Sequence, residues 1–172
     1  LEAWGDLSQL ARLAMLKAAL TIVSDSALST AAGQRTLDAA LVLLREACSV
    51  DVIPTRVYAL QVLEVWLDRR ASGPCIGRGE VHAINALLHV NWVHRSRAVK
   101  QVVPAVYKKF ASFVAALVTA NEGEGVGSSM WVELLSYVLG QASQYKNKYM
   151  ALVVLVPYVG ATAVLKTHKG FI

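Results

Sequence analysis

Hydrophobic residues recur at steps of three and four along most of the chain, and no stretch alternates convincingly as a strand would. The clearest example is 91–117, where apolar residues share one face of a helix and polar residues share the opposite face. The apolar face carries Val99, Val103, Val106, Phe110, Phe113 and Leu117, and the polar face carries Arg97, Lys100, Gln101 and Lys108. The pattern predicts an amphipathic helix over about 96–119, with Ser96 able to cap it and Pro104 expected to bend or locally break it.

The same periodicity predicts further helices joined by short polar or glycine-containing connections. They span 6–23, 34–48, 54–70, 80–91, 129–143, 147–156 and 157–165. Asp6 or Ser8 is expected to cap the first of them, and Pro157 is expected to separate the last two. Residues 24–33 are expected to form a polar connection. The predicted fold class is all-α.

The expected helices form antiparallel pairs at 6–48, 54–91, 96–143 and 147–165, and their spacing of about 40–50 residues matches HEAT and armadillo repeats. We therefore predict that 1–172 is a single helical-repeat segment of a larger protein, stacked as an armadillo/HEAT-like solenoid. No repeat consensus is strictly kept along the chain. A globular helical bundle is the alternative.

The chain is unusually apolar: 55% of its residues are hydrophobic and 17% are charged, against roughly 45–50% and 25% in ordinary soluble domains. Either membrane insertion or contact with further parts of a larger protein would account for this excess. The longest uncharged run, Tyr149–Leu165, is short for a spanning helix, and Pro157 and Gly160 interrupt it. Buried helices, with no membrane span, are therefore the preferred interpretation.

Positive charge is concentrated in the second half of the chain. Residues 1–94 hold eight basic and nine acidic residues, whereas residues 95–172 hold nine basic and three acidic residues. The candidate contact residues are Arg95, Arg97, Lys100, Lys108, Lys109, Lys146 and Lys148. Tyr107 and Tyr145 lie beside lysines, where their rings could stack or hydrogen-bond near a nucleic-acid backbone. This asymmetry indicates a polyanion partner, with an acidic protein or a merely solvated polar face as alternatives.

Cysteine and histidine give no strong sign of a metal site. Cys48 and Cys75 are far apart and in no paired motif, which is typical of reduced cysteines in a cytoplasmic protein. His82 and His89 are seven residues apart, whereas zinc-binding helices usually present ligands three or four apart. Even with Cys75 and His94 included, we favour solvated or hydrogen-bonded histidines over a metal.

The sequence also lacks the motifs of the common enzyme classes. There is no Gly-x-Ser-x-Gly motif, and no cysteine has the sequence context of a nucleophile. The glycine-containing stretches 73–79 and 123–127 follow or separate helices, so they lack the strand that precedes a dinucleotide or phosphate loop. We therefore predict a protein that is not an enzyme and has no cofactor of its own.

Three segments of the chain carry distinctive groups of residues. The first contains Tyr58-Ala59-Leu60 and Trp66-Leu67. The second contains Asn91-Trp92-Val93-His94, Ala98-Val99-Lys100-Gln101 and Tyr107-Lys108-Lys109-Phe110. The third contains Lys146-Asn147-Lys148-Tyr149, Leu152, Leu155-Val156, Gly160-Ala161 and Leu165. In this order the three segments resemble the thyroid adenoma-associated protein family. The resemblance covers about 54–172. One departure is Arg95, which stands where the family often has a proline after the tryptophan-containing turn.

The resemblance implies a non-catalytic scaffold, because that family comprises large armadillo-type proteins. Its fungal member is the partner subunit of a tRNA ribose methyltransferase. The function it implies is to hold tRNA for an FtsJ-like, S-adenosylmethionine-dependent 2′-O-methyltransferase that acts in the anticodon loop. The matched positions Lys100, Lys108, Lys146 and Lys148 then become candidates for contact with tRNA or the partner. The alternatives are a general protein–protein interaction module with no RNA role and a membrane-associated helical protein.

Overall fold

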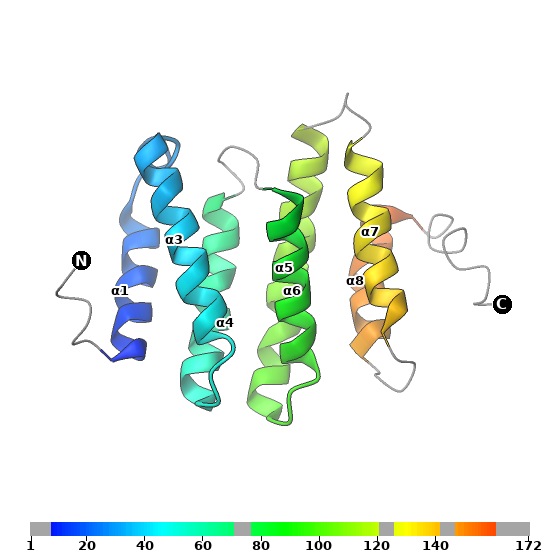
Figure 1. The fold of residues 1–172 in the computed structure, drawn as a ribbon, viewed down its shortest axis with the longest axis horizontal. Coiled ribbons are helices and arrows are strands. Elements are labelled where there is room, and N and C mark those ends of the chain that lie inside the picture. Colours follow the sequence, from blue (N-terminus) through cyan, green and yellow to red (C-terminus); the bar gives the residue numbers. More distant parts are fainter. Residues whose placement is uncertain (1–7, 71–76, 121–125, 142–146, 161–172) are drawn as a thin grey trace.

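The computed structural model describes residues 8–70, 77–120, 126–141 and 147–160, and every regular element in these ranges is helical. The helices are α1 (Gln9–Ile22), α2 (Asp25–Leu28), α3 (Ala31–Ala47), α4 (Ile53–Arg70), α5 (Arg78–Trp92), α6 (Arg97–Ala120), α7 (Val126–Gly140) and α8 (Asn147–Val159). The predicted all-α class is confirmed. Figure 1 shows the long helices side by side, from α1 at one end to α8 at the other.

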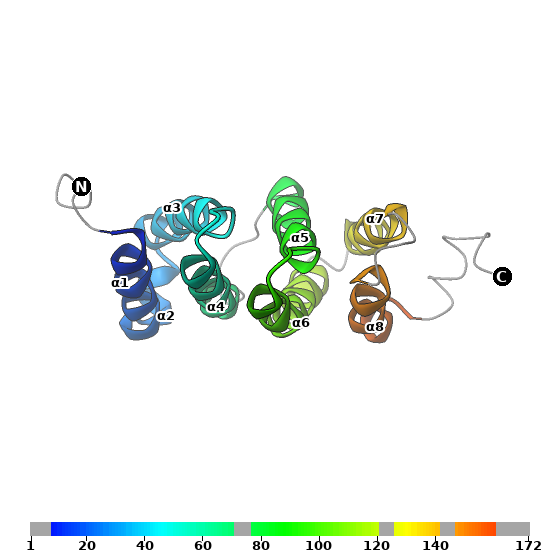
Figure 2. The ribbon, with the colours of Figure 1, turned by 90° about the horizontal axis from the view of Figure 1, so that it is seen from below.

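The helices form two rows, which Figure 2 shows end-on. The first row contains α1, α4, α6 and α8, and the second row contains α3, α5 and α7. The first-row helices contact one another in that order, and the second row packs onto them through α3 on α4, α5 on α6 and α7 on α8. The expected pairs joined the helix at 54–70 with that at 80–91, and the helix at 96–119 with that at 129–143. In the structure the more extensive contacts are instead those of α3 with α4 and of α5 with α6.

Helix α6 is the central element of the core, since it contacts α4, α5, α7 and α8. Its buried face carries Val99, Val103, Val106, Tyr107, Phe110, Ala111, Phe113, Val114 and Leu117, and this includes every apolar position expected from the sequence. Among the described helices, α6 alone is long and apolar enough to cross a membrane by length and composition. Its apolar face packs against four other helices, as in the core helix of a helical fold.

Hydroxyl side chains begin the first three helices. Ser8 caps α1 as expected, because its Oγ accepts a hydrogen bond from the Ala11 N–H at 3.3 Å. The expected connection 24–33 instead contains the short helix α2 and the start of α3. Thr30 accepts from the Gly33 N–H at 3.1 Å, so α3 begins earlier than the predicted residue 34. Ser24 likewise caps α2, because its Oγ accepts from the Ala27 N–H at 3.4 Å. The caps of Ser24 and Thr30 therefore place helices within the expected connection.

Neither internal proline separates two helices. Helix α6 continues through Pro104, and α8 continues through Pro157. The expected division into 147–156 and 157–165 is therefore wrong at Pro157, and 161–165 lie outside the described residues. A proline inside a helix removes one backbone N–H from the hydrogen-bond ladder, which weakens the helix. In α8 the packing of the buried residues Leu152 and Leu155 in the core offsets this loss. Helix α8 ends before Gly160, whose φ of +81° is the left-handed conformation common after a helix.

A buried arginine fastens three helices at one end of the fold. The Nε and Nη2 atoms of Arg56 on α4 donate to the carbonyls of Val50 and Ser49, both at 2.7 Å. Its Nη1 atom lies 3.4 Å from Oδ1 of Asn91 on α5, and both side chains are buried. The guanidinium thus satisfies carbonyls just beyond α3 while linking α4 to α5. This contact fixes the end of the molecule from which the basic helix α6 starts.

Candidate nucleic-acid interface

The outer face of α6 presents three exposed cations. Arg97, Lys100 and Lys108 are all exposed, and none forms an ion pair within the part of the chain that the structure describes. Arg97 and Lys108 are close to three helical turns apart, or about 16 Å, so they lie on the same side of the helix. Helical spacing places Arg97 and Lys108 opposite the buried residues of α6, and Lys100 is exposed at the side of the helix near its start. They form the free part of the predicted basic surface.

Two other predicted residues, Arg95 and Lys109, have acidic partners. Arg95 lies 3.3 Å from Asp51, and both side chains are largely exposed, at 80% and 77%. Lys109 lies 2.9 Å from Asp68 on α4. The hydrogen bond to Asp68 raises the pKa of Lys109, and the negative charge of the carboxylate adds to this. Surface pairs of this kind are weak, so a phosphate could replace either carboxylate.

His94 lies close to the start of α6 and adds little positive charge there. Burial lowers the pKa of His94, and the nearby charges of Arg56, Arg95 and Lys100 lower it further, against an opposite effect of Asp51. The imidazole is therefore neutral at pH 7. Its Nδ1 atom accepts a hydrogen bond from the backbone N–H of Ser96 at 3.1 Å, which orders the turn that leads into α6.

The remaining predicted contact residues precede or begin α8. Lys146 lies outside the described residues, and Lys148 is placed only through its backbone in the first turn of α8. Helix α8 contacts α6 in the same row, and Figure 1 shows that both helices start at the same end of the molecule. The start of α8 therefore lies on the same side of the fold as Arg97 and Lys100.

The aromatic part of the predicted interface is not on the surface. Tyr107 is completely buried, and its hydroxyl donates to Oδ1 of Asn85 at 3.1 Å. Its ring centre lies 4.9 Å from that of Trp92 and 5.6 Å from that of His89. The expectation that Tyr107 could stack on a nucleic acid is therefore wrong, because helical spacing turns this ring inward. Tyr145 lies outside the described residues.

The histidines considered as metal ligands occupy different environments. Nε2 of His82 lies 2.7 Å from Glu133 on α7, which also pairs with Arg78 at 3.1 Å. His89 is buried among aromatic rings, and burial lowers its pKa to about 4. Within the described ranges no cluster of three or more His, Cys, Asp or Glu residues could hold a metal. Cys75 lies outside these ranges. Burial raises the pKa of Cys48 to about 12, so its thiol stays protonated.

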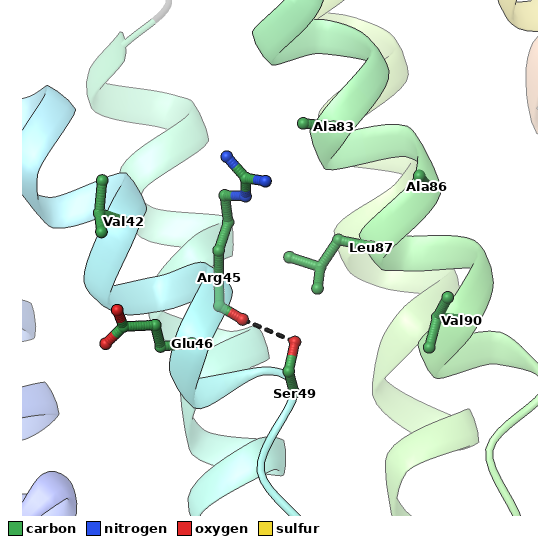
Figure 3. A pocket seen from close by; sticks show the side chains of 8 residues that line it. All are labelled: Val42, Arg45, Glu46, Ser49, Ala83, Ala86, Leu87 and Val90. Carbon is green, nitrogen blue, oxygen red and sulfur yellow. Dashed lines mark hydrogen bonds between the residues drawn. The ribbon is translucent and has the colours of Figure 1, made fainter.

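The structure also contains a groove that the sequence did not reveal. It lies between α3 and α5, has a volume of about 600 Å³, and is lined by Val42, Arg45, Glu46, Ser49, Ala83, Ala86, Leu87 and Val90 (Figure 3). The small alanines on α5 and the valines that point out of the core are its only signal in the sequence. That signal becomes readable only once α3 and α5 are placed in the same row.

Comparisons with known proteins assign no family to the chain. No protein-family model, curated protein or solved structure matches it. A functional assignment therefore depends on the surfaces described above and on the segments that resemble the thyroid adenoma-associated protein family.

Proposed function

We propose that the chain is a segment of an armadillo/HEAT-like solenoid that acts as a cytoplasmic, non-catalytic scaffold. In this proposal it holds tRNA for an FtsJ-like 2′-O-methyltransferase, which supplies catalysis and the S-adenosylmethionine site. The observation that carries the proposal is a group of three exposed cations on α6, Arg97, Lys100 and Lys108, none of which has an ion pair with another described residue. The same helix contains the segment that resembles the thyroid adenoma-associated protein family.

The arrangement of the helices supports the solenoid part of the proposal. Each helix contacts mainly its neighbours in two rows, as in repeat arrays, in which a stack grows along one direction. Large apolar side chains are exposed on both terminal helices: Leu10, Met15 and Ile22 on α1, and Tyr149, Met150 and Val153 on α8. Further helical repeats of the same protein would cover these faces, as internal repeats cover one another.

The chemistry of the basic face suits contact with a phosphate backbone. Lysine and arginine that neutralise phosphates release counterions, which makes the affinity strongly salt-dependent. Such contacts position a nucleic acid without reading its bases. Tyr107 is buried, so it cannot offer its ring to a base on this face. Positioning tRNA while the partner enzyme selects the nucleotide is therefore the role that this surface fits best.

Charge reversal on α6 tests the proposal directly. The triple variant Arg97→Glu, Lys100→Glu, Lys108→Glu should bind tRNA more weakly in a fluorescence-anisotropy titration repeated over a salt series. The slope of log Kobs against log salt should become shallower by about one for each phosphate that the variant no longer neutralises. All three residues are exposed on the outer face of α6, so circular dichroism and thermal unfolding should match the wild type.

A single charge reversal on another helix provides the matched control. Lys108→Glu and Arg35→Glu change the net charge equally, but Arg35 lies on α3 in the second row. Weakening by Lys108→Glu alone would support the α6 face, whereas equal weakening would indicate only a net-charge effect. Unchanged tRNA binding in the triple variant would contradict the proposed surface.

A protein-interaction role without RNA is the second candidate, and the groove between α3 and α5 favours it. The two functions are distinguished by purification of the full-length protein with and without nuclease. The scaffold proposal requires tRNA to co-purify and a methyltransferase to remain associated after nuclease treatment. The alternative requires neither tRNA nor a methyltransferase.

A further inference from the structure

The groove between α3 and α5 exposes apolar surface that a monomer would normally cover. Val42 on α3 is 56% exposed and Val90 on α5 is 58% exposed, and they lie at opposite margins of the groove, with Arg45 and Leu87 between them (Figure 3). Leu87 is partly buried and also projects into this space, and Ala83 and Ala86 leave room beside it. The groove is therefore an apolar channel along two helices, with small residues that allow another backbone to approach closely.

A single cation is directed into this channel. Figure 3 shows the guanidinium of Arg45 extending into the space between α3 and α5, whereas the carboxylate of Glu46 points away from α5. Arg45 is exposed, and its side chain has neither an ion pair nor a hydrogen bond with any other described residue. Its backbone carbonyl alone is engaged, accepting from the Ser49 hydroxyl at 2.8 Å. An arginine in this position suits a carboxylate from an incoming chain.

We propose that the groove between α3 and α5 docks an acidic amphipathic helix of a partner protein. Apolar residues one helical turn apart on that helix would pack between Val42, Leu87 and Val90. A carboxylate beside them would pair with Arg45. The helix lies on the second row, so it leaves the basic face of α6 free, and docking is independent of tRNA binding.

A fluorescein-labelled amphipathic helical peptide with one leucine face flanked by glutamates is the probe. The control peptide has the same leucine face but carries lysines in place of the glutamates. Fluorescence anisotropy should show the acidic peptide binding about tenfold or more tightly than the basic one, which corresponds to ~1.4 kcal/mol. Arg45→Glu should reverse this preference, because it places a carboxylate where the guanidinium was. Val90→Asp should weaken both peptides by placing a charge in the apolar channel.

Arg35→Glu is the matched control, since it makes the same charge change on the same helix, outside the residues that line the groove. It should leave the preference unchanged. A preference that survives Arg45→Glu, or equal binding of the two peptides, would overturn the proposal.

A photo-crosslinking amino acid at Ala86 then locates the occupant. The labelled peptide should be captured there, and acidic peptide in excess should compete with it. Crosslinking of Ala86 to another segment of the same chain, undiminished by excess peptide, would show that the groove has an internal occupant. That result would overturn the assignment to a partner.

Discussion

At the scale of single residues, His89 makes the stability of the fold depend on pH. Its side chain is buried against Tyr107, Trp92 and Tyr137, and its Nε2 atom has no hydrogen-bond partner among the described residues. Burial lowers its pKa to about 4, whereas an unfolded histidine has a pKa near 6.5. The folded state therefore binds the proton more weakly than the unfolded state. The contribution of His89 to the free energy of unfolding is therefore fully present above pH 6.5 and is lost as the pH falls toward 4.

We expect the free energy of unfolding to fall by about 3 kcal/mol between pH 7 and pH 4 through His89 alone. His89→Phe should remove this part of the dependence, because phenylalanine stays neutral and fills the aromatic site. Urea titrations of wild type and variant, followed by circular dichroism, measure the difference at each pH. The difference should change little from pH 7 to pH 8, because the histidine is neutral in the folded state and mostly neutral in the unfolded state. A difference that also stays constant down to pH 4 would contradict this account.

The residue scale also shows what the sequence could reveal about the site. Arg97, Lys100 and Lys108 were recognisable because they lie opposite a clear apolar face, and the structure leaves them exposed. The partners Asp51 and Asp68 of Arg95 and Lys109 could not be recognised. Each is more than 40 residues away from its partner, as shown by the separations of 44 and 41. Only tertiary packing brings such pairs together.

At the scale of elements, the start of α3 depends on a glycine that the helical pattern did not single out. A Cβ at Gly33 would lie 2.3 Å from the Ala27 carbonyl oxygen and 2.6 Å from the Leu28 Cα. Both are backbone atoms of α2, so they cannot rotate away as a side chain would. Gly33→Ala should therefore destabilise the fold by about 1–3 kcal/mol, the usual effect of overpacking.

Gly79→Ala provides the control for that substitution. Gly79 lies in the first turn of α5, and nothing lies within 4 Å of a Cβ built there. Alanine should therefore stabilise this helix by about 0.5–1 kcal/mol, since glycine is the weaker helix former. Urea denaturation of both variants separates the effects. Equal changes in the two variants would show that α2 yields to the new methyl group.

Helices were easier to predict than their boundaries. The long helices follow from local periodicity, which packing later reinforces. The short helix α2 depends on the cap of Ser24, and the early start of α3 depends on the cap of Thr30. Both residue types are also common in loops. Pro157 predicted a boundary that the packing of α8 overrides, and Gly160 marks the end instead. Local chemistry thus sets where helices can begin or end, and tertiary contacts choose among these places.

At the scale of the whole molecule, the two rows could not be derived from helical spacing alone. The helices α3 and α5 are neighbours in one row although α4 separates them in sequence. This placement creates the groove around Leu87 and turns the basic side of α6 away from it. The sequence indicated repeated helical pairs, but which faces meet depends on complementary packing between whole helices. The two surfaces proposed for binding therefore lie on different rows.

The terminal helices give the prediction that belongs to the whole molecule. Ile22 on α1 is 82% exposed, beside Tyr58 of α4, and Val153 on α8 is 69% exposed. Exposed apolar residues lie near both on the same helices, Met15 on α1 and Tyr149 and Met150 on α8. The isolated chain should bury these faces by self-association at high concentration, because exposed apolar patches favour contact. The double variant Ile22→Lys, Val153→Lys should remain monomeric in sedimentation velocity runs, with an unchanged circular dichroism spectrum. Val52→Lys, at a residue 57% exposed in the connection before α4, should still self-associate like the wild type. A wild-type chain that stays monomeric throughout would argue against further repeats covering these faces.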